Sequence, residues 1–179
     1  LRHQTMQTDI RKILAGDQLA GARLIRLLEE GDPGGIAGIK DLYAHTGDAF
    51  ILGITGPPGS GKSTLISQMI TECRQRELKV GVVAVDPSSP LTGGAFLGDR
   101  LRMHQHTEDG GVFIRSMATR GHLGGLGTMT REVALVLDAM GYDVVMIETV
   151  GVGQAEVEII EFAHTTMVVS LPGTGDDIQ

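Results

Sequence analysis

The stretch GITGPPGSGKSTLI at residues 53–66 places a glycine-rich loop between an apolar run and a predicted helix. Residues 56–63 fit the pattern GxxxxGK[ST], in which the loop backbone curls so that its N–H groups point inward and surround phosphates. The helix predicted to start near Lys62 adds the positive end of its dipole beneath the same phosphates. The alternative is an ordinary glycine-rich turn, and the flanking strand and helix favour the phosphate loop over it.

In such a loop Lys62 reaches the β- and γ-phosphates of a nucleotide, and the Ser63 hydroxyl binds Mg²⁺. The two prolines stiffen a loop that must already be shaped when the ligand arrives. We therefore expect the phosphates to be bound by residues Gly56, Pro57, Pro58, Gly59, Ser60, Gly61, Lys62, Ser63 and Thr64. The loop alone does not distinguish ATPases, GTPases and small-molecule kinases.

Five apolar runs along the chain are predicted to form strands. They lie at residues 49–55, 80–85, 112–116, 142–149 and 165–171. Their residues are apolar at consecutive positions, which is typical of strands covered on both faces. Between them, apolar residues recur at helical spacing over 65–73 and 133–140. This alternation of strand and helix predicts an α/β fold with a doubly wound, mainly parallel sheet.

Residues 1–46 are predicted to form a helical N-terminal extension, and residues 47–179 a phosphate-loop domain. Asp17 is a candidate N-cap for a first helix, which Gly31 and Pro33 are expected to end. The residues expected on successive turns of that helix are Leu19, Arg23, Leu24, Leu27 and Leu28. A second helix from Gly35 to His45 is expected to present Ile36, Ile39, Leu42 and Tyr43 on one side.

Composition narrows the function classes. The net charge of −7 argues against nucleic acid or a membrane surface as a partner bound through bulk charge. No apolar run approaches the roughly 20 residues that a membrane span requires. The single cysteine, Cys73, excludes an intramolecular disulfide and fits a reducing compartment, so we expect the cytoplasm or an organelle matrix. The chain lacks an initiator Met and stops abruptly, and we interpret it as a fragment.

Two carboxylates follow apolar runs at positions that suit a metal. Asp86 ends the run VAVD and is predicted to bind Mg²⁺ directly or through water, although a turn Asp is the commoner role. Glu148 ends the run VVMIE, which is the Walker B arrangement, with Glu where Asp is commoner. Its longer side chain suggests a contact through water. Ligands in such sheets lie beyond the carboxyl ends of the strands, which favours the functional interpretation of both residues.

Two other residues, Asp99 and Gln154, are candidates with open alternatives. Asp99 either caps a helix starting at Arg100 or reaches the metal, in which case Arg100 or Arg102 would lie near the phosphates. Gln154 follows Gly151 and Gly153 and could position the attacking water, whereas a solvated Gln at a helix start is an equal alternative.

Histidines and a glycine run give weaker signals. Residues 120–127, RGHLGGLG, are too rich in glycine for a routine linker, and His122 is either a general base or, more commonly, an exposed loop residue. His104 and His106 would not share a helix face, so we expect no transition-metal site there and assign both to structural or solvated roles.

Taken in order, the motifs GPPGSGKST, VDPSSP, GDRxRM, RGHLGGL, ETVGVGQ and LPGTGDDIQ resemble the MeaB/ArgK-type family of P-loop GTPases associated with methylmalonyl-CoA mutase. The resemblance covers residues 1–179 and places the chain in the class of signal-recognition and nickel-chaperone GTPases. It implies GTP or GDP with Mg²⁺ as ligands, slow hydrolysis of GTP, and gating of adenosylcobalamin delivery to a mutase that the protein also protects. It further implies a homodimer, and a cobalamin adenosyltransferase as a further partner.

The resemblance also assigns residues. Ser63, Asp86, Asp99 and Glu148 would surround Mg²⁺, and Lys62 would hold the phosphates. Catalysis would depend on Lys62, Asp99, Glu148, Arg102 as a transition-state cation, and Gln154. Residues 86–102, 148–154 and 173–179 resemble three switch segments. The family reads guanine through an Asn-Lys-x-Asp motif that these 179 residues do not contain, so the preference for GTP is implied by the family alone.

Two other functions stay open on the sequence. In a small-molecule kinase, Asp86 would be the base for an acceptor hydroxyl, although no Arg-rich lid is evident. In a nucleotide-sensing binding module, the nucleotide would change partner affinity without phosphate release.

Overall fold

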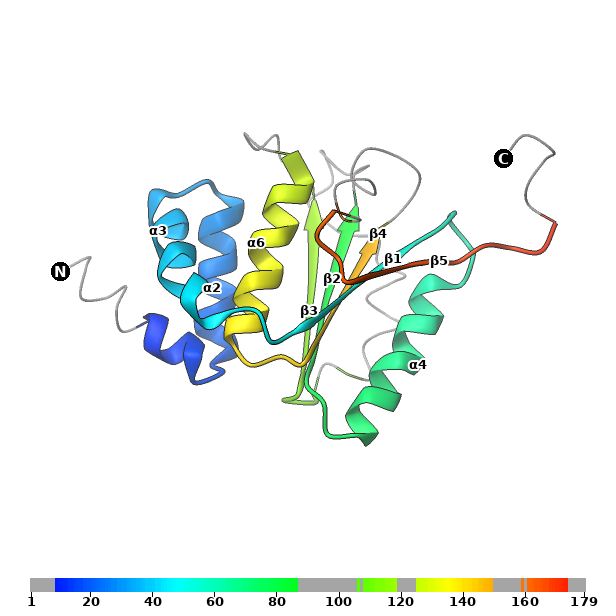
Figure 1. Cartoon of the computed structure of the whole chain (residues 1–179), viewed down its shortest axis with the longest axis horizontal. Coiled ribbons are helices and arrows are strands. Elements are labelled where there is room, and N and C mark those ends of the chain that lie inside the picture. The colour runs from blue at the N-terminus through cyan, green and yellow to red at the C-terminus, as the bar shows by residue number, and fades with distance from the viewer. Residues whose placement is uncertain are drawn as a thin grey trace.

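The fold is built on a five-stranded sheet in the order β3-β2-β4-β1-β5, with every neighbouring pair parallel. The computed structural model describes residues 9–86, 106, 108–118, 125–149, 159 and 161–173. The strands are β1 (Phe50–Thr55), β2 (Val80–Asp86), β3 (Val112–Ala118), β4 (Val144–Thr149) and β5 (Thr165–Val168). The predicted α/β fold with a parallel sheet is confirmed, and each predicted apolar run overlaps one of the strands, although β2 and β3 continue past the predicted ends at residues 85 and 116 (Figure 1).

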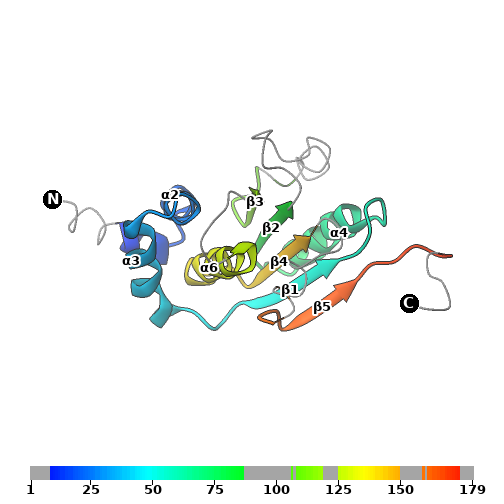
Figure 2. The same cartoon turned by 90° about the horizontal axis from the view of Figure 1, so that it is seen from above.

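Helices cover the sheet on both faces. Helix α4 (Lys62–Gln75) packs on one face and α6 (Gly125–Ala139) on the other. Helices α2 (Gln18–Glu29) and α3 (Pro33–Leu42) pack against the outer side of α6, so the sheet is flanked by one helical layer on one face and two on the other (Figure 2). A 3₁₀ turn, η1 (Tyr43–His45), leads from α3 toward β1.

Alternation along the strands gives each face its own core. On β4, Val145 and Ile147 belong to the cluster with α6, whereas Met146 belongs to the cluster with α4. All three are fully buried. Gly81 on β2 lets α6 approach closely, because a Cβ there would lie 2.8 Å from Leu137 Cδ1. The run of consecutive apolar residues in the sequence therefore reflects two cores that share one strand.

The strand β5 differs from the prediction of burial on both faces. Among the described residues it pairs with β1 alone, and Val168 is 69% exposed. The helices α4 and α6 contact the inner strands β2 and β4. The run of consecutive apolar residues therefore predicted the presence of this strand correctly, but the predicted burial on both faces is wrong.

Capping residues define the first helix largely as predicted. The Asp17 carboxylate accepts a hydrogen bond from the Ala20 N–H at 2.9 Å at the start of α2. Pro33 was expected to end this helix, but it is the first residue of α3, where Asp32 is the N-cap. Proline suits that position because its missing N–H would have no partner in the helix. Of the residues expected on successive turns of this helix, Leu24 and Leu28 are buried, whereas Leu19 is 63% exposed.

The predicted second helix, Gly35–His45, is corrected to Pro33–Leu42 followed by the 3₁₀ turn. Its buried side also differs, because Ile36 and Tyr43 are exposed. Gly35 and Gly38 face α2 instead, and a Cβ on Gly38 would lie 2.6 Å from Leu24 Cδ1. Glycines carry no hydrophobic signal, so the pattern of apolar residues missed this close helix contact.

Polar contacts join the N-terminal helices to the sheet. Gln18 Nε2 donates to the Tyr142 hydroxyl at 2.9 Å, and Arg115 on β3 forms a two-pronged ion pair with Glu29 on α2. One hydrophobic cluster contains residues of α2, α3, α6 and the sheet. The proposed division at residue 46 stays a prediction. In the described part of the chain, no helix is both long and apolar enough to cross a membrane.

Candidate nucleotide-phosphate site

A tight loop connects the carboxyl end of β1 to α4. Its glycines Gly56, Gly59 and Gly61 have φ angles of +142°, +81° and +91°, which side-chain-bearing residues rarely adopt. Gly56 has a second constraint, because a Cβ there would collide with the carbonyl oxygen of Val169, which follows β5. The glycine spacing of the motif is therefore required by backbone geometry alone.

Lys62 is the first residue of α4, and its side chain turns back over the loop. Its Nζ donates hydrogen bonds to the carbonyl oxygens of Gly56 at 2.8 Å and Pro57 at 3.0 Å, and the residue is only 5% exposed. No carboxylate among the described residues forms an ion pair with it. A buried cation with only neutral partners is costly unless an anion joins it. The loop thus presents a positive charge that a phosphate would neutralise.

The start of α4 adds backbone donors to this charge. Gly61 is the N-cap in a left-handed conformation, and no side chain of the described residues caps the helix. The N–H groups of the first turn have no partners within the helix. Such groups form anion sites at the N-termini of other helices. Thr64, the third residue of α4, is exposed at this end.

Ser63 and Glu148 meet beneath the loop. The Ser63 hydroxyl donates to Glu148 Oε1 at 2.9 Å, although the residues are 85 positions apart. The parallel pairing of β1 and β4 brings them together, since Ile54 is opposite Glu148 in the register. Both residues are more than nine-tenths buried. The structure thus brings Glu148 to Ser63, and this direct bond was not expected from the sequence.

These two oxygens fit a magnesium site. Mg²⁺ prefers oxygen ligands in octahedral geometry at about 2.1 Å, so neighbouring ligands lie about 3 Å apart. The Ser63 and Glu148 oxygens are 2.9 Å apart and face the same loop. The donor set therefore matches what this metal requires.

Of the other predicted site residues, the structure describes only the backbone of Asp86. The backbone of Asp86 ends β2 at the same edge of the sheet, one residue beyond Val85, which pairs with Thr149. Asp99, Arg102 and Gln154 lie outside the described residues. His122 and most of the glycine run at 120–127 lie outside them too.

Sequence reasoning missed a second buried polar pair beside the loop. Ser67 Oγ and His106 Nε2 are 3.2 Å apart, and both residues are more than nine-tenths buried. The signal was a serine one turn after Ser63 within the apolar stripe of the helix. His106 was assigned a structural or solvated role, and burial excludes the solvated one.

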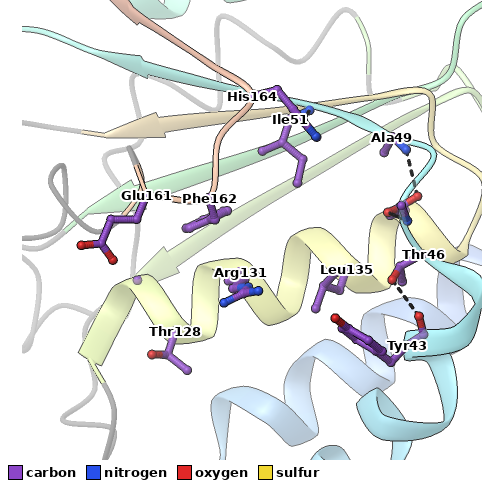
Figure 3. A pocket seen from close by; sticks show the side chains of 13 residues that line it. Tyr43, Thr46, Ala49, Ile51, Thr128, Arg131, Leu135, Glu161, Phe162 and His164 are labelled. Atoms are coloured by element: carbon purple, nitrogen blue, oxygen red, sulfur yellow. Dashed lines mark hydrogen bonds between the residues drawn. The ribbon is translucent and has the colours of Figure 1, made fainter.

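A separate cavity of about 740 Å³ lies on the α6 side of the sheet, near the amino end of β1 (Figure 3). The connection from η1 to β1, helix α6 and the segment before β5 surround it. Its charged lining is mixed, with Arg131 and Glu161 both exposed. It includes no residue of the phosphate loop, and the chemistry described above lies at the opposite end of β1.

Comparisons with known proteins agree with this geometry. A sequence model described as methylmalonyl Co-A mutase-associated GTPase MeaB matches residues 21–179. The chain is 39% identical over 183 residues to the GTPase ArgK of Escherichia coli, covering 100% of this chain and 55% of ArgK. A Pyrococcus abyssi protein named provisionally as a GTPase is 55% identical over 170 residues, covering 95% of this chain and 52% of that protein.

A solved structure shares the fold. The crystal structure of an LAO/AO transport system kinase superposes with a TM-score of 0.75 at 30% identity, covering 93% of this chain and 50% of that one. The chain therefore spans about half the length of the relatives it matches.

Proposed function

Because the chain belongs to the family of methylmalonyl Co-A mutase-associated GTPases called MeaB, we propose that it binds GTP with Mg²⁺ at the loop 56–64 and hydrolyses the γ-phosphate. The observation that carries this proposal is Lys62. Its buried ammonium group has two carbonyl partners and, among the described residues, no carboxylate partner, and it lies at the start of helix α4. A triphosphate would supply the anion that this arrangement requires.

The residues divide the work of phosphoryl transfer. Lys62 would exchange its carbonyl partners for β- and γ-phosphate oxygens. Ser63 and Glu148 would hold Mg²⁺, together with Asp86 and Asp99 as the sequence predicts. When bound, the metal neutralises charge on the phosphates. Because little covalent chemistry falls to the protein, positioning and electrostatic stabilisation account for most of the rate in this class of reaction.

The two remaining candidates carry the hydrolytic step. Arg102 would stabilise charge on the transferring phosphoryl group, and Gln154 would orient the attacking water. Both assignments come from the sequence. They predict that Arg102→Ala and Gln154→Ala lower the rate of hydrolysis more than they weaken binding of GTP.

The cellular role follows from the family name. We propose that nucleotide turnover gates delivery of adenosylcobalamin to methylmalonyl-CoA mutase or a related acyl-CoA mutase, and protects that enzyme. A homodimer and contact with a cobalamin adenosyltransferase belong to the same proposal.

Rates of GTP and ATP hydrolysis, measured with and without the mutase, test it directly. We expect GTP to be preferred and the rate to change when the mutase is added. Equal use of ATP, or no response to the mutase, would contradict the chaperone role.

Because one structural relative is named as a transport system kinase, the alternative to a GTPase is a small-molecule kinase. A kinase would transfer the γ-phosphate to an acceptor molecule, whereas a GTPase releases it to water. Following γ-³²P from labelled GTP separates the two, because label on an organic acceptor supports a kinase. Binding of GTP with no phosphate release from any mixture would instead indicate a nucleotide-sensing module.

A further inference from the structure

The buried pair of Ser67 and His106 lies one helical turn from the proposed metal ligand. Ser63 and Ser67 are four residues apart, so they lie on the same side of α4, and both face inward. Ser63 Oγ is bonded to Glu148 on β4, and Ser67 Oγ to His106 Nε2. The first two turns of the helix are therefore held by two directional polar contacts from different parts of the fold.

A second contact joins the C-terminal end of α4 to Asp109, in the turn that also contains His106. Arg74 Nε and Asp109 Oδ2 are 2.9 Å apart, and Asp109 N–H donates to the His106 carbonyl at 3.2 Å. His106 and Asp109 thus contact α4 two turns apart. Unlike the Ser67 pair, the Arg74 ion pair is partly exposed and lies far from Ser63 along the helix.

Apolar packing fixes the rotation of α4 about its own axis less sharply than a directional hydrogen bond does. Ile66 and Ile70 are fully buried between the two contacts, but hydrophobic contact has no preferred direction. A rotation of a few degrees would move the Ser63 hydroxyl away from Glu148 with little change in buried area. A hydrogen bond between two buried groups resists such a rotation, because its strength depends on the distance and angle between donor and acceptor.

We infer that His106 is a positioning residue for magnesium: through Ser67 it sets the rotation of α4, and so places the Ser63 hydroxyl where the metal and Glu148 meet. This inference rests on the proposed function, since it concerns the same site. A hydrolytic role for the Ser67–His106 pair does not fit, because both side chains are buried between α4 and the turn that begins at His106.

The experiment uses the full chain and follows fluorescent GDP binding as the Mg²⁺ concentration is raised. His106→Leu and Ser67→Ala each remove the buried hydrogen bond, and Ser67→Ala does so with the smaller change in volume. We expect both to raise the Mg²⁺ concentration needed for tight GDP binding about tenfold, as loss of an outer partner of a metal ligand commonly does. Affinity for GDP without Mg²⁺ should change less than about twofold, because Lys62 and the loop are untouched.

Two further variants separate positioning from simple stabilisation. Arg74→Met removes the contact at the far end of α4, and should lower the melting temperature while leaving the Mg²⁺ dependence unchanged. His106→Gln restores a side-chain amide near the position of Nε2, and should recover most of the lost Mg²⁺ response. The double variant Ser67→Ala/His106→Leu should show no more than the effect of the stronger single variant.

The outcomes distinguish this inference from the proposed function. If Ser67→Ala and His106→Leu lose thermal stability but keep the Mg²⁺ dependence of the unaltered chain, His106 is an ordinary core residue and the inference is wrong. If the unaltered chain shows no Mg²⁺-dependent GDP binding at all, the proposed function fails and the inference fails with it.

Discussion

The two ends of β1 use the same backbone chemistry for different purposes. At its amino end, the N–H groups of Gly47 and Ala49 converge on the carboxylate of Asp138 at 2.6 Å and 3.0 Å. At its carboxyl end, the first turn of α4 has N–H groups without partners inside the helix. The buried Lys62 begins this turn, and no carboxylate of the described residues pairs with that lysine. One end carries its own anion, whereas the other is arranged to receive one.

This difference separates a structural anion site from a binding site. Asp138 lies on α6 and is buried, so its hydrogen bonds join the connection 46–49 to that helix. Among the described residues, no carboxylate compensates the charge of Lys62 in the phosphate loop, and a buried charge without a counter-ion costs stability until a ligand arrives. Substitutions at the amino end should therefore change folding, and substitutions at the carboxyl end should change binding.

The largest effect is expected from Lys62→Met, which removes the charge but keeps most of the side chain. Charge-assisted hydrogen bonds to phosphate oxygens are lost, so we expect GDP affinity to fall by at least about 100-fold, or roughly 3 kcal/mol. Calorimetric titration measures it. Thermal stability without nucleotide should stay equal or rise, because a buried charge has gone. Unchanged affinity would remove the central observation behind the proposed function.

The counterpart at the amino end is Asp138→Ala. It leaves backbone N–H groups at residues 47–49 without their acceptor, and we expect a loss of about 2–3 kcal/mol in the free energy of unfolding. Urea denaturation followed by circular dichroism measures this. Asp138→Asn keeps one acceptor oxygen and should lose less. GDP affinity of the folded variants should match that of the unaltered chain. A large drop in affinity would show that the two ends are coupled.

A matched pair of glycine substitutions sharpens the comparison further. Gly47 and Gly56 have φ angles of +118° and +142°, so alanine is strained at both positions. A Cβ at Gly47 meets nothing within 4 Å, whereas at Gly56 it collides with the Val169 carbonyl. We expect Gly47→Ala to cost about 1 kcal/mol of stability. Gly56→Ala should cost more, and should also weaken GDP binding. Equal losses of stability for the two variants would mean that the chain after β5 moves away from the loop at little cost in free energy.

The smallest effect concerns pH. The hydrogen bond from the Arg74 guanidinium, helped by the Gly111 N–H, lowers the pKa of the Asp109 carboxyl. A group whose pKa is lower in the folded state adds stability above its unfolded pKa, and this is lost as the pH falls through the folded value. Asp109→Asn should therefore be less stable at pH 7, with the difference shrinking as the pH approaches 3.

Because this ion pair is partly exposed, we expect a difference below about 1 kcal/mol. Melting temperatures between pH 3 and pH 7 test it. If the stability difference between Asp109→Asn and the unaltered chain stays constant over this range, the loss comes from altered packing or hydrogen bonding and not from the charge of the carboxylate.

The sequence predicted the carboxyl end of β1 better than the amino end. The loop, the helix start at Lys62 and the approach of Glu148 follow from short-range motifs and from parallel strand order. The role of Asp138 depends on a contact across 89–91 residues, which periodicity does not encode. The buried Ser67–His106 pair was missed for the same reason, since its partners are 39 residues apart.

Burial was the least predictable property of the individual elements. Val168 lies in an apolar run but is exposed, because the described part of the sheet ends at β5. Ile36 was expected on the same side of its helix as Ile39, yet it is exposed, and Gly35 and Gly38 occupy the contact with α2. Hydrophobic patterns identify which segments are regular, and the neighbouring elements then decide which residues are covered.

The shared core of α2, α3 and α6 has a practical consequence for dissecting the molecule. A shortened chain that begins at residue 47 would lose Ile25, Leu28 and Leu42, each at most 5% exposed. It would also expose the hydrophobic outer side of α6 to solvent. Such a product should aggregate on expression. The smallest recombinant piece worth making for crystallography or nucleotide assays therefore begins before Asp17.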